Sequence, residues 1–175
     1  MPSRLRVPGG YLVGVLALVL ARPSVRSLLW AVPLVLCGEA IRLWASGHLE
    51  KTRALATGGP YAHTRNPLYF GSALMAVGLA AAAASPWVVL AVAGYFFAFY
   101  PRVVREEARF LRDRFGADYE SWAAGVPLFW PRFTPGGPRG TRFEWRRVAL
   151  NREWRTAAAL PAVALLLYLR GHWPA

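Results

Sequence analysis

The chain has 175 residues, of which 55% are hydrophobic and 17% are charged, and its 21 basic residues against 9 acidic ones give a net charge of +12. Its length predicts a single domain, and a lone cysteine, Cys37, excludes an intrachain disulfide framework. So large a positive charge is typical of nucleic-acid-binding proteins, but so apolar a chain can carry it only if apolar and basic residues are segregated. A disordered basic tail is therefore excluded, and we expect no nucleic-acid partner.

Long uncharged stretches separate the basic segments. The longest, residues 66–101, has 36 residues without an ionisable Asp, Glu, Lys, Arg or His. One membrane span needs about 20 residues, so this stretch must fold back, and Ala84–Pro86 is the expected turn because proline disfavours helix in the residue before it. We expect an all-α integral membrane helical bundle of about five transmembrane helices, at residues 10–21, 25–45, 66–84, 86–102 and 148–169.

The distribution of arginine predicts the orientation of these spans. With the N-terminus inside, five spans leave 18 of the 21 basic residues on the cytoplasmic side, and only Arg22, Arg26 and Arg170 outside. This asymmetry satisfies the positive-inside rule, and arginines at that face contact anionic lipid headgroups. Together with a high Arg, Ala and Gly content, it indicates an integral protein of a prokaryotic inner membrane whose polar segments face the cytoplasm.

The first polar segment reads GGPYAHTRNPLYFG, from Gly58 to Gly71. Its two glycines and Pro60 cannot propagate a helix, whereas Pro67 suits the first turn of one. Arg65 and Asn66 would then lie beside a positive helix N-terminus, where free backbone N–H groups suit a carboxylate or a phosphate. An ordinary interfacial loop, with Arg65 on lipid headgroups, explains the same residues about equally well.

The second polar segment runs from Arg102 to Pro131. Apolar residues recur in it at helical spacing and predict an amphipathic helix that leaves the membrane: Val104, Ala108, Leu111 and Phe115. Gly116 is the expected end of that helix, and a second short helix should end before Val126. Glu106 lies four residues after Arg102, so the two can meet as a surface ion pair, but a partly buried charge at the membrane boundary is costly and therefore favours a function.

These two segments together resemble a known superfamily. GPYAHTRNPLYFG is similar to the Gly-Pro-Tyr and Arg-His-Pro-x-Tyr signature of the membrane-embedded isoprenylcysteine carboxyl methyltransferase and phospholipid methyltransferase superfamily. EEARFLRDRFGADYESWAAGVPLFWP resembles its Glu-Glu, Phe-Gly-x-x-Tyr-x-x-Tyr and Val-Pro block. The resemblance covers about residues 40–131. Asn66 replaces the usual His, and Trp122 replaces a Tyr.

The resemblance implies an integral membrane methyltransferase that uses S-adenosylmethionine, releases S-adenosylhomocysteine and has no Rossmann domain. It implies one domain over residues 1–175, with a motif core at 40–131 and an extra C-terminal helix at 146–170. Arg102 and Glu106 are then the candidate catalytic residues, with Arg105 as the alternative to Arg102. The implied cofactor-binding residues are Tyr61, His63, Arg65, Asn66, Pro67, Tyr69, Gly71 and Glu107.

The chemistry of S-adenosylmethionine agrees with these residue types. Its carboxylate, ammonium and sulfonium need a cation or helix N-terminus, a carboxylate, and hydroxyl or amide groups, and no metal is required. The lipophilic acceptor stays open between a prenylated cysteine carboxylate, a phospholipid amine, an isoprenoid and a small thiol. Arg102 would orient a carboxylate, whereas Glu106 could accept the proton of an amine or thiol. The alternatives are an NADPH-dependent membrane reductase similar to steroid 5-alpha-reductases and a non-catalytic membrane scaffold.

For four polar residues elsewhere, the sequence indicates a role less specifically. Glu39 and Arg42 lie three residues apart in the second expected span, where charges usually pair, and we expect a structural pair rather than a role in an acceptor tunnel. Asn151 and Glu153 precede the last span. They either close the site from the cytoplasm or cap and anchor that helix, and the second role is favoured.

Overall fold

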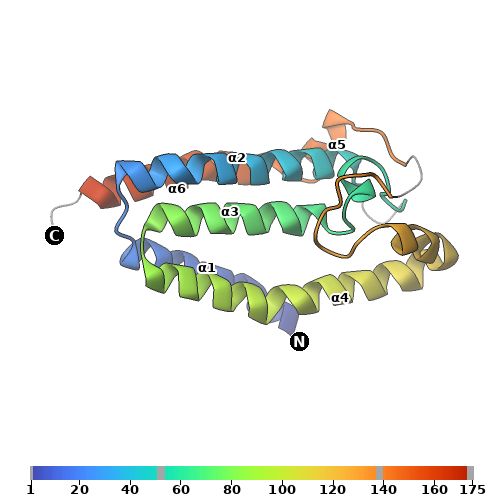
Figure 1. Cartoon of the computed structure of the whole chain (residues 1–175), viewed down its shortest axis with the longest axis horizontal. Helices are drawn as coiled ribbons and strands as arrows, with labels where there is room; N and C mark the ends of the chain where they lie inside the picture. Colours follow the sequence, from blue (N-terminus) through green and yellow to red (C-terminus); the bar gives the residue numbers. More distant parts are fainter. Residues whose placement is uncertain (1, 51–53, 137–139, 173–175) are drawn as a thin grey trace. The chain divides into compact units, whose positions relative to one another are not determined.

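The structure, a computed structural model, describes residues 2–50, 54–136 and 140–172, with side chains from residue 8 onward. The chain is 77% helical, and the described ranges contain no strand, so the expected all-α class is confirmed. Lys51, Arg53 and Arg139, which the charge count includes, lie outside these ranges. The elements in chain order (Figure 1) are α1 (Pro2–Leu20), α2 (Val25–His48), the 3-10 helix η1 (Gly59–Ala62), α3 (Pro67–Ala83), α4 (Pro86–Gly125), α5 (Trp145–Leu150) and α6 (Trp154–His172).

Two helices of the described chain, α2 and α4, are long and apolar enough to cross a membrane. The apolar part of α1, Pro8–Leu20, and α3 are shorter apolar helices. At 17 residues α3 is about 25 Å long, against a hydrocarbon core of about 30 Å. The chain is thus an all-α membrane bundle, while the number of about five spans stays a prediction.

The chain folds into two compact units, each assembled from separate stretches. Unit 1 comprises Met1–Gly38, Ala73–Val103 and Ala157–Ala175, and unit 2 comprises Glu39–Ser72 and Val104–Thr156. Both α2 and α4 therefore contribute residues to each unit. The organisation as one domain over residues 1–175 stays a prediction.

Small side chains form the core of unit 1. Its buried residues are Ala21, Ala31, Ala80, Ala82, Ala83, Val88 and Leu167. A Cβ atom at Gly78 would lie 2.7 Å from Val35 Cγ2 and 3.2 Å from the Ala31 carbonyl. Residue 78 must therefore be glycine for α2 and α3 to approach this closely.

The expected turn between α3 and α4 is confirmed. Helix α3 ends at Ala83, Ala84 has a positive φ of 47°, and α4 begins at Pro86. The last carbonyls of a helix have no partner within it. Here the Arg22 N–H donates to the Ala83 carbonyl (2.8 Å) and the Ser27 hydroxyl to that of Ala82 (2.9 Å), which closes the end of α3.

Aromatic side chains dominate the core of unit 2, which consists of Ala45, Ala56, Tyr61, Tyr119, Trp122 and Val126. Gly116 interrupts α4 with φ 49° and ψ −121°, as its position in the sequence predicts, and the short helix after it ends at Gly125. Tyr119 and Trp122 on that short helix are only 1% and 2% exposed. The break at Gly116 thus supplies two of the largest side chains in this core.

The last expected span, 148–169, is two helices. Helix α5 ends at Leu150, Arg152 has a positive φ of 58°, and α6 begins at Trp154. The Asn151 amide donates to the carbonyls of Ser46 and Leu49, each at 2.9 Å. Its side chain therefore closes the C-terminal end of α2, rather than capping the last helix as expected.

Candidate functional site

The loop before α3 is held in one shape by its glycines. Gly59 has φ +56°, in the left-handed region that favours glycine, and a Cβ atom at Gly58 would overlap the Thr141 carbonyl. Pro60 and Tyr61 in η1 are buried. The loop is therefore a fixed structure, as the sequence predicts.

Hydrogen bonds join this loop to the segment that follows α4. The Thr64 hydroxyl donates to the Phe129 carbonyl at 2.8 Å, and the Arg132 N–H donates to the His63 carbonyl at 3.0 Å. The His63 ring makes a further bond of 2.8 Å between Nδ1 and the Arg132 carbonyl. The loop and the end of the second polar segment are thus adjacent within unit 2.

Asn66 occupies the position where the superfamily has a histidine. Its side chain is buried and its Nδ2 donates to the Leu128 carbonyl at 2.8 Å, while its backbone N–H donates to the Thr64 hydroxyl at 3.3 Å. Pro67 after it is fully buried and begins α3, and Gly71 is buried one turn further along. In the described chain, Asn66 therefore holds the loop in place, and a contact with a cofactor stays a prediction.

The Arg65 side chain in this loop has one N–H donor without a hydrogen-bond partner among the described residues. Its Nη1 donates to the Tyr119 hydroxyl at 3.1 Å, and its backbone N–H donates to the Pro127 carbonyl at 2.9 Å. Its Nε is buried and has no hydrogen-bond partner among the described residues. A buried donor without a partner costs about 1–3 kcal/mol. Because Arg65 also stands at the N-terminus of α3, the arrangement suits an anionic ligand.

Tyr61 lies beneath the same loop. Its carbonyl accepts a hydrogen bond of 3.1 Å from the Trp122 indole. Burial raises the pKa of the Tyr61 phenol, and the negative charges of Glu107, Glu153 and Tyr69 raise it further. The charges of Glu107 and Tyr69 thus act on Tyr61, while the role of these three residues in binding a cofactor stays a prediction.

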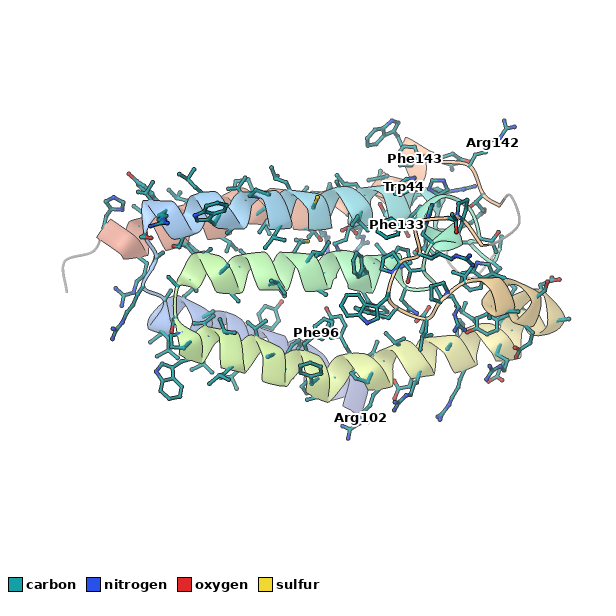
Figure 2. All side chains as sticks on the ribbon, in the orientation of Figure 1. Trp44, Phe96, Arg102, Phe133, Arg142 and Phe143 are labelled. Atoms are coloured by element: carbon teal, nitrogen blue, oxygen red, sulfur yellow. The ribbon has the colours of Figure 1, made fainter. Side chains whose placement is uncertain are left out.

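The predicted catalytic residues are on α4. Arg102 belongs to unit 1, whereas Glu106 and Glu107 belong to unit 2. All three are exposed, as is Arg105, and Figure 2 shows the Arg102 side chain projecting outward from its helix. The sequence predicts that these charges are partly buried at the membrane boundary, where they would be costly. The structure shows them exposed, so this reason for assigning them a function no longer applies. Their catalytic roles stay predictions.

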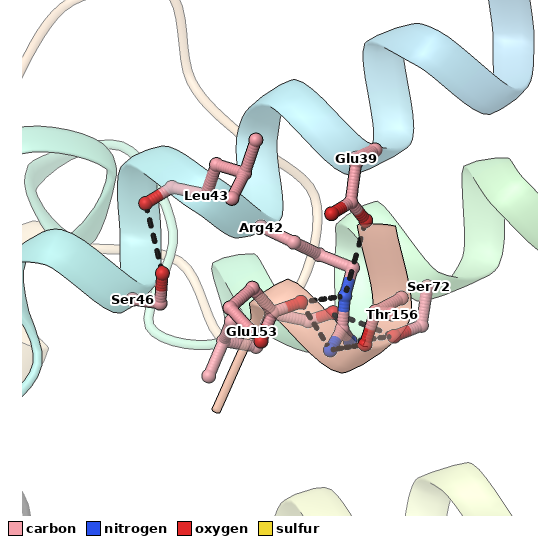
Figure 3. Close-up of polar contacts among 8 residues, drawn as sticks. Glu39, Arg42, Leu43, Ser46, Ser72, Glu153 and Thr156 are labelled. Carbon is pink, nitrogen blue, oxygen red and sulfur yellow. Dashed lines mark hydrogen bonds and ion pairs between the residues drawn. The ribbon is translucent and has the colours of Figure 1, made fainter. Parts of the chain in front are cut away.

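Sequence reasoning missed a second polar cluster in unit 2 (Figure 3). Arg42 pairs mainly with Glu153, at 2.7 Å from Nε and 2.6 Å from Nη2, whereas the expected partner Glu39 is 4.0 Å away. An arginine in an apolar helix signals a buried partner. Glu153, however, is 111 residues away, and its spacing from Arg42 carries no signal. Tyr119, which binds Arg65, also lies far away in the sequence, and the spacing of the two residues likewise gives no sign that they are partners.

Residues 40–118 match the family model of phospholipid methyltransferase, a family of the isoprenylcysteine carboxyl methyltransferase-like superfamily. The resemblance seen in the two motifs is therefore confirmed. The match includes the fixed loop, Glu106 and Glu107.

Two curated relatives share a segment of 95 residues with this chain. The cobalt-zinc-cadmium resistance protein CzcN of Cupriavidus metallidurans is 37% identical, and the nickel-cobalt-cadmium resistance protein NccN of Alcaligenes xylosoxydans xylosoxydans is 34% identical. Each match covers 53% of this chain and 44% of the relative, so the chain spans less than half the length of these relatives. No solved structure matches the chain.

Proposed function

We propose that the chain is an integral membrane methyltransferase that uses S-adenosylmethionine to methylate a lipophilic acceptor at the cytoplasmic face of a prokaryotic inner membrane. The observation that supports this most is the buried Nε of Arg65, which has no hydrogen-bond partner among the described residues. It lies in the loop that carries the family match, at the start of α3. Such a donor needs a hydrogen-bond acceptor, and the positive charge of the guanidinium favours an anionic one.

The residues around this donor fit S-adenosylmethionine. Arg65 and the first backbone N–H groups of α3 would bind its carboxylate, and Glu107 would bind its ammonium group. The hydroxyls of Tyr61 and Tyr69 are suited to its ribose or adenine. The chemistry that the cofactor supplies when bound is an electrophilic methyl group on a sulfonium.

The chain's own residues then have two tasks. The buried loop must hold the methyl donor in line with the acceptor and exclude water from it, and both effects lower the barrier to such a displacement. Glu106 is proposed to accept the proton of an amine or thiol acceptor, and Arg102 to orient a carboxylate acceptor. The names of the two relatives suggest metal resistance as the physiological setting of this activity.

Calorimetry of the purified protein with S-adenosylhomocysteine tests the proposal. Arg65→Met should weaken binding at least tenfold, because it removes the free donor, whereas Arg146→Met, at an exposed position on α5, should not change it. Titration with NADPH is the parallel arm. Absence of S-adenosylhomocysteine binding at millimolar concentration, or binding of NADPH in its place, would overturn the proposal.

A further inference from the structure

The chain after α4 forms a loop whose two ends meet at a pair of glycines. A Cβ atom at Gly125 would overlap the Gly136 carbonyl, and a Cβ atom at Gly136 would overlap the Gly125 carbonyl. The Arg132 side chain bridges back to the same place, since its Nη1 donates to the Gly125 carbonyl at 2.7 Å. Only glycine allows the two ends to approach this closely. Residues 126–135 are therefore a closed, compact loop, which we call the aromatic loop.

The backbone of the aromatic loop is bound to the segment just before α3. Three consecutive carbonyls accept hydrogen bonds of 2.8–2.9 Å from residues 64–66: those of Pro127, Leu128 and Phe129. The Arg132 N–H donates to the same segment at 3.0 Å, and Pro131 has no N–H to satisfy. Backbone groups without partners keep an irregular segment out of lipid. At these positions, the aromatic loop does not have that obstacle.

The aromatic loop exposes large apolar side chains. Phe133 is fully exposed, at 102%, and Trp130 is 75% exposed. The loop contains no acidic residue, and its single basic residue is Arg132. Because the backbone is fixed, these rings cannot fold inward to escape water, and uncovered apolar surface is unfavourable. A surface of this kind indicates a contact with an apolar phase or with a partner.

The rings of the aromatic loop continue the apolar surface of α3. Phe70, in the first turn of α3, packs edge-on against Phe129 and Trp130, with ring centroids 5.9 and 6.1 Å apart. Phe129 and Trp130 also pack against each other, at 5.6 Å. Helix α3 has 17 residues and is about 5 Å shorter than the hydrocarbon core. The aromatic loop thus adds apolar surface at one end of a helix that is too short for the core.

We propose that the aromatic loop inserts Trp130 and Phe133 into the headgroup region of the phospholipid bilayer, beside the start of α3. Tryptophan is enriched at this depth of the membrane, and the positive charge of Arg132 suits the phosphates of anionic lipids. The contact with the first turn of α3 favours lipid over a soluble protein partner, because headgroups surround the end of an apolar helix. The second polar segment, expected to face the cytoplasm, then returns to the membrane at its end.

A nitroxide label at residue 134 tests the proposal, because Thr134→Cys leaves both exposed rings in place. Cys37→Ala removes the native thiol. The labelled protein is placed in nanodiscs of phosphatidylcholine and phosphatidylglycerol, and electron paramagnetic resonance measures collisions with oxygen, which concentrates in lipid, and with a water-soluble nickel chelate. We expect the oxygen-to-nickel ratio to be about threefold higher than for a label at Ser121→Cys, an exposed position on the helix after Gly116.

Removal of one ring tests whether the aromatic side chains hold the loop in the membrane. Phe133→Ser should lower the ratio at Thr134→Cys toward the value at Ser121→Cys. Because Phe133 is fully exposed, this substitution removes no core contact, and the melting temperature should stay unchanged. Phe110→Ser is the matched control, since the Phe110 ring is half-exposed on α4, and it should leave the ratio unchanged.

Three results would overturn the proposal. The first is a ratio at residue 134 as low as that at residue 121, which would place the aromatic loop in water. The second is protection from both oxygen and the nickel chelate, which would show that protein covers the loop. Loss of this protection in nanodiscs that hold one copy each would identify a second copy of the chain as that cover. The third is an unchanged ratio in Phe133→Ser, which would show that the ring does not anchor the loop.

Discussion

The Nη1 of Arg65 donates a hydrogen bond of 3.1 Å to the hydroxyl of Tyr119, which ties the loop before α3 to the short helix after Gly116. The two residues are 54 positions apart, and Tyr119 is buried. This bond orients the guanidinium whose Nε has no partner within the part of the chain that the structure describes. It is thus the link between the fold of unit 2 and the proposed anion site.

We expect Tyr119→Phe to lower the stability of the protein and its affinity for S-adenosylhomocysteine together. The substitution retains the buried ring but leaves a second donor of Arg65 unpaired, at a cost of about 1–3 kcal/mol. Thermal unfolding in detergent and calorimetry measure the two effects. Tyr11→Phe, at an exposed position, is the control and should change neither. Unchanged affinity in Tyr119→Phe would show that this bond does not orient the site.

Arg42→Met should destabilise the protein by about 3–5 kcal/mol, because it leaves the buried carboxylates of Glu39 and Glu153 without a cation. The melting temperature measures this. Arg112→Met provides the comparison: Arg112 pairs with Glu120, but both side chains are more than half exposed, and such pairs contribute about 0–1 kcal/mol. Equal effects of the two substitutions would contradict the assignment of Arg42 as the cation that stabilises these buried carboxylates.

Gly58→Ala should destabilise the loop, since the added Cβ would overlap the Thr141 carbonyl, a backbone atom that cannot swing aside. The expected result is a lower melting temperature and weaker S-adenosylhomocysteine binding. Gly94→Ala is the matched control because a Cβ atom there meets nothing within 4 Å. A fixed loop is excluded if the two variants behave alike.

The pKa of Tyr61 tests whether Glu107 belongs to the site. Burial and the charge of Glu107 raise this pKa, so the neutral phenol stabilises the fold below pH of about 10, and that contribution is lost as pH rises above it. Tyr61→Phe should therefore lose less stability than the wild type as the pH rises from about 9 to about 11. Melting curves over this range measure the difference.

Glu107→Gln should lower the pKa of Tyr61, because it removes a negative charge that acts on the phenol. The loss of stability with rising pH begins at the ordinary pKa of tyrosine in both proteins, but it should level off at a lower pH in Glu107→Gln, so that less stability is lost in total. Tyr61→Phe should abolish the difference between the two proteins. Glu106→Gln serves as the control, since Glu106 is not among the charges that raise this pKa. A shift in Glu106→Gln of the same size would place the wrong glutamate beside Tyr61.

Features that depend on neighbouring residues could be predicted from the sequence. The turn before Pro86, the start of α3 at Pro67 and the break at Gly116 follow from the backbone preferences of proline and glycine. That the two polar segments lie together in one unit is implied by the superfamily motifs that they carry, and not by their distance along the chain.

Features that join distant residues could not be predicted in this way. Arg42 pairs with Glu153 rather than with Glu39, although Glu39 is only three residues away. The Asn151 amide likewise binds the end of α2, about 100 residues earlier in the chain. One sequence contains no record of such long-range pairing, so the partner of Arg42 emerges only from the structure.

Methyl transfer itself tests the central claim most directly. The purified protein in nanodiscs is incubated with S-adenosylmethionine labelled in its methyl group and with total bacterial lipid extract, and label in the organic phase is identified by mass spectrometry. The account predicts a labelled lipophilic product that is lost in Arg65→Met, reduced in Glu106→Gln and retained in Arg146→Met. No labelled product from a protein that is folded and supplied with donor and lipids would contradict it.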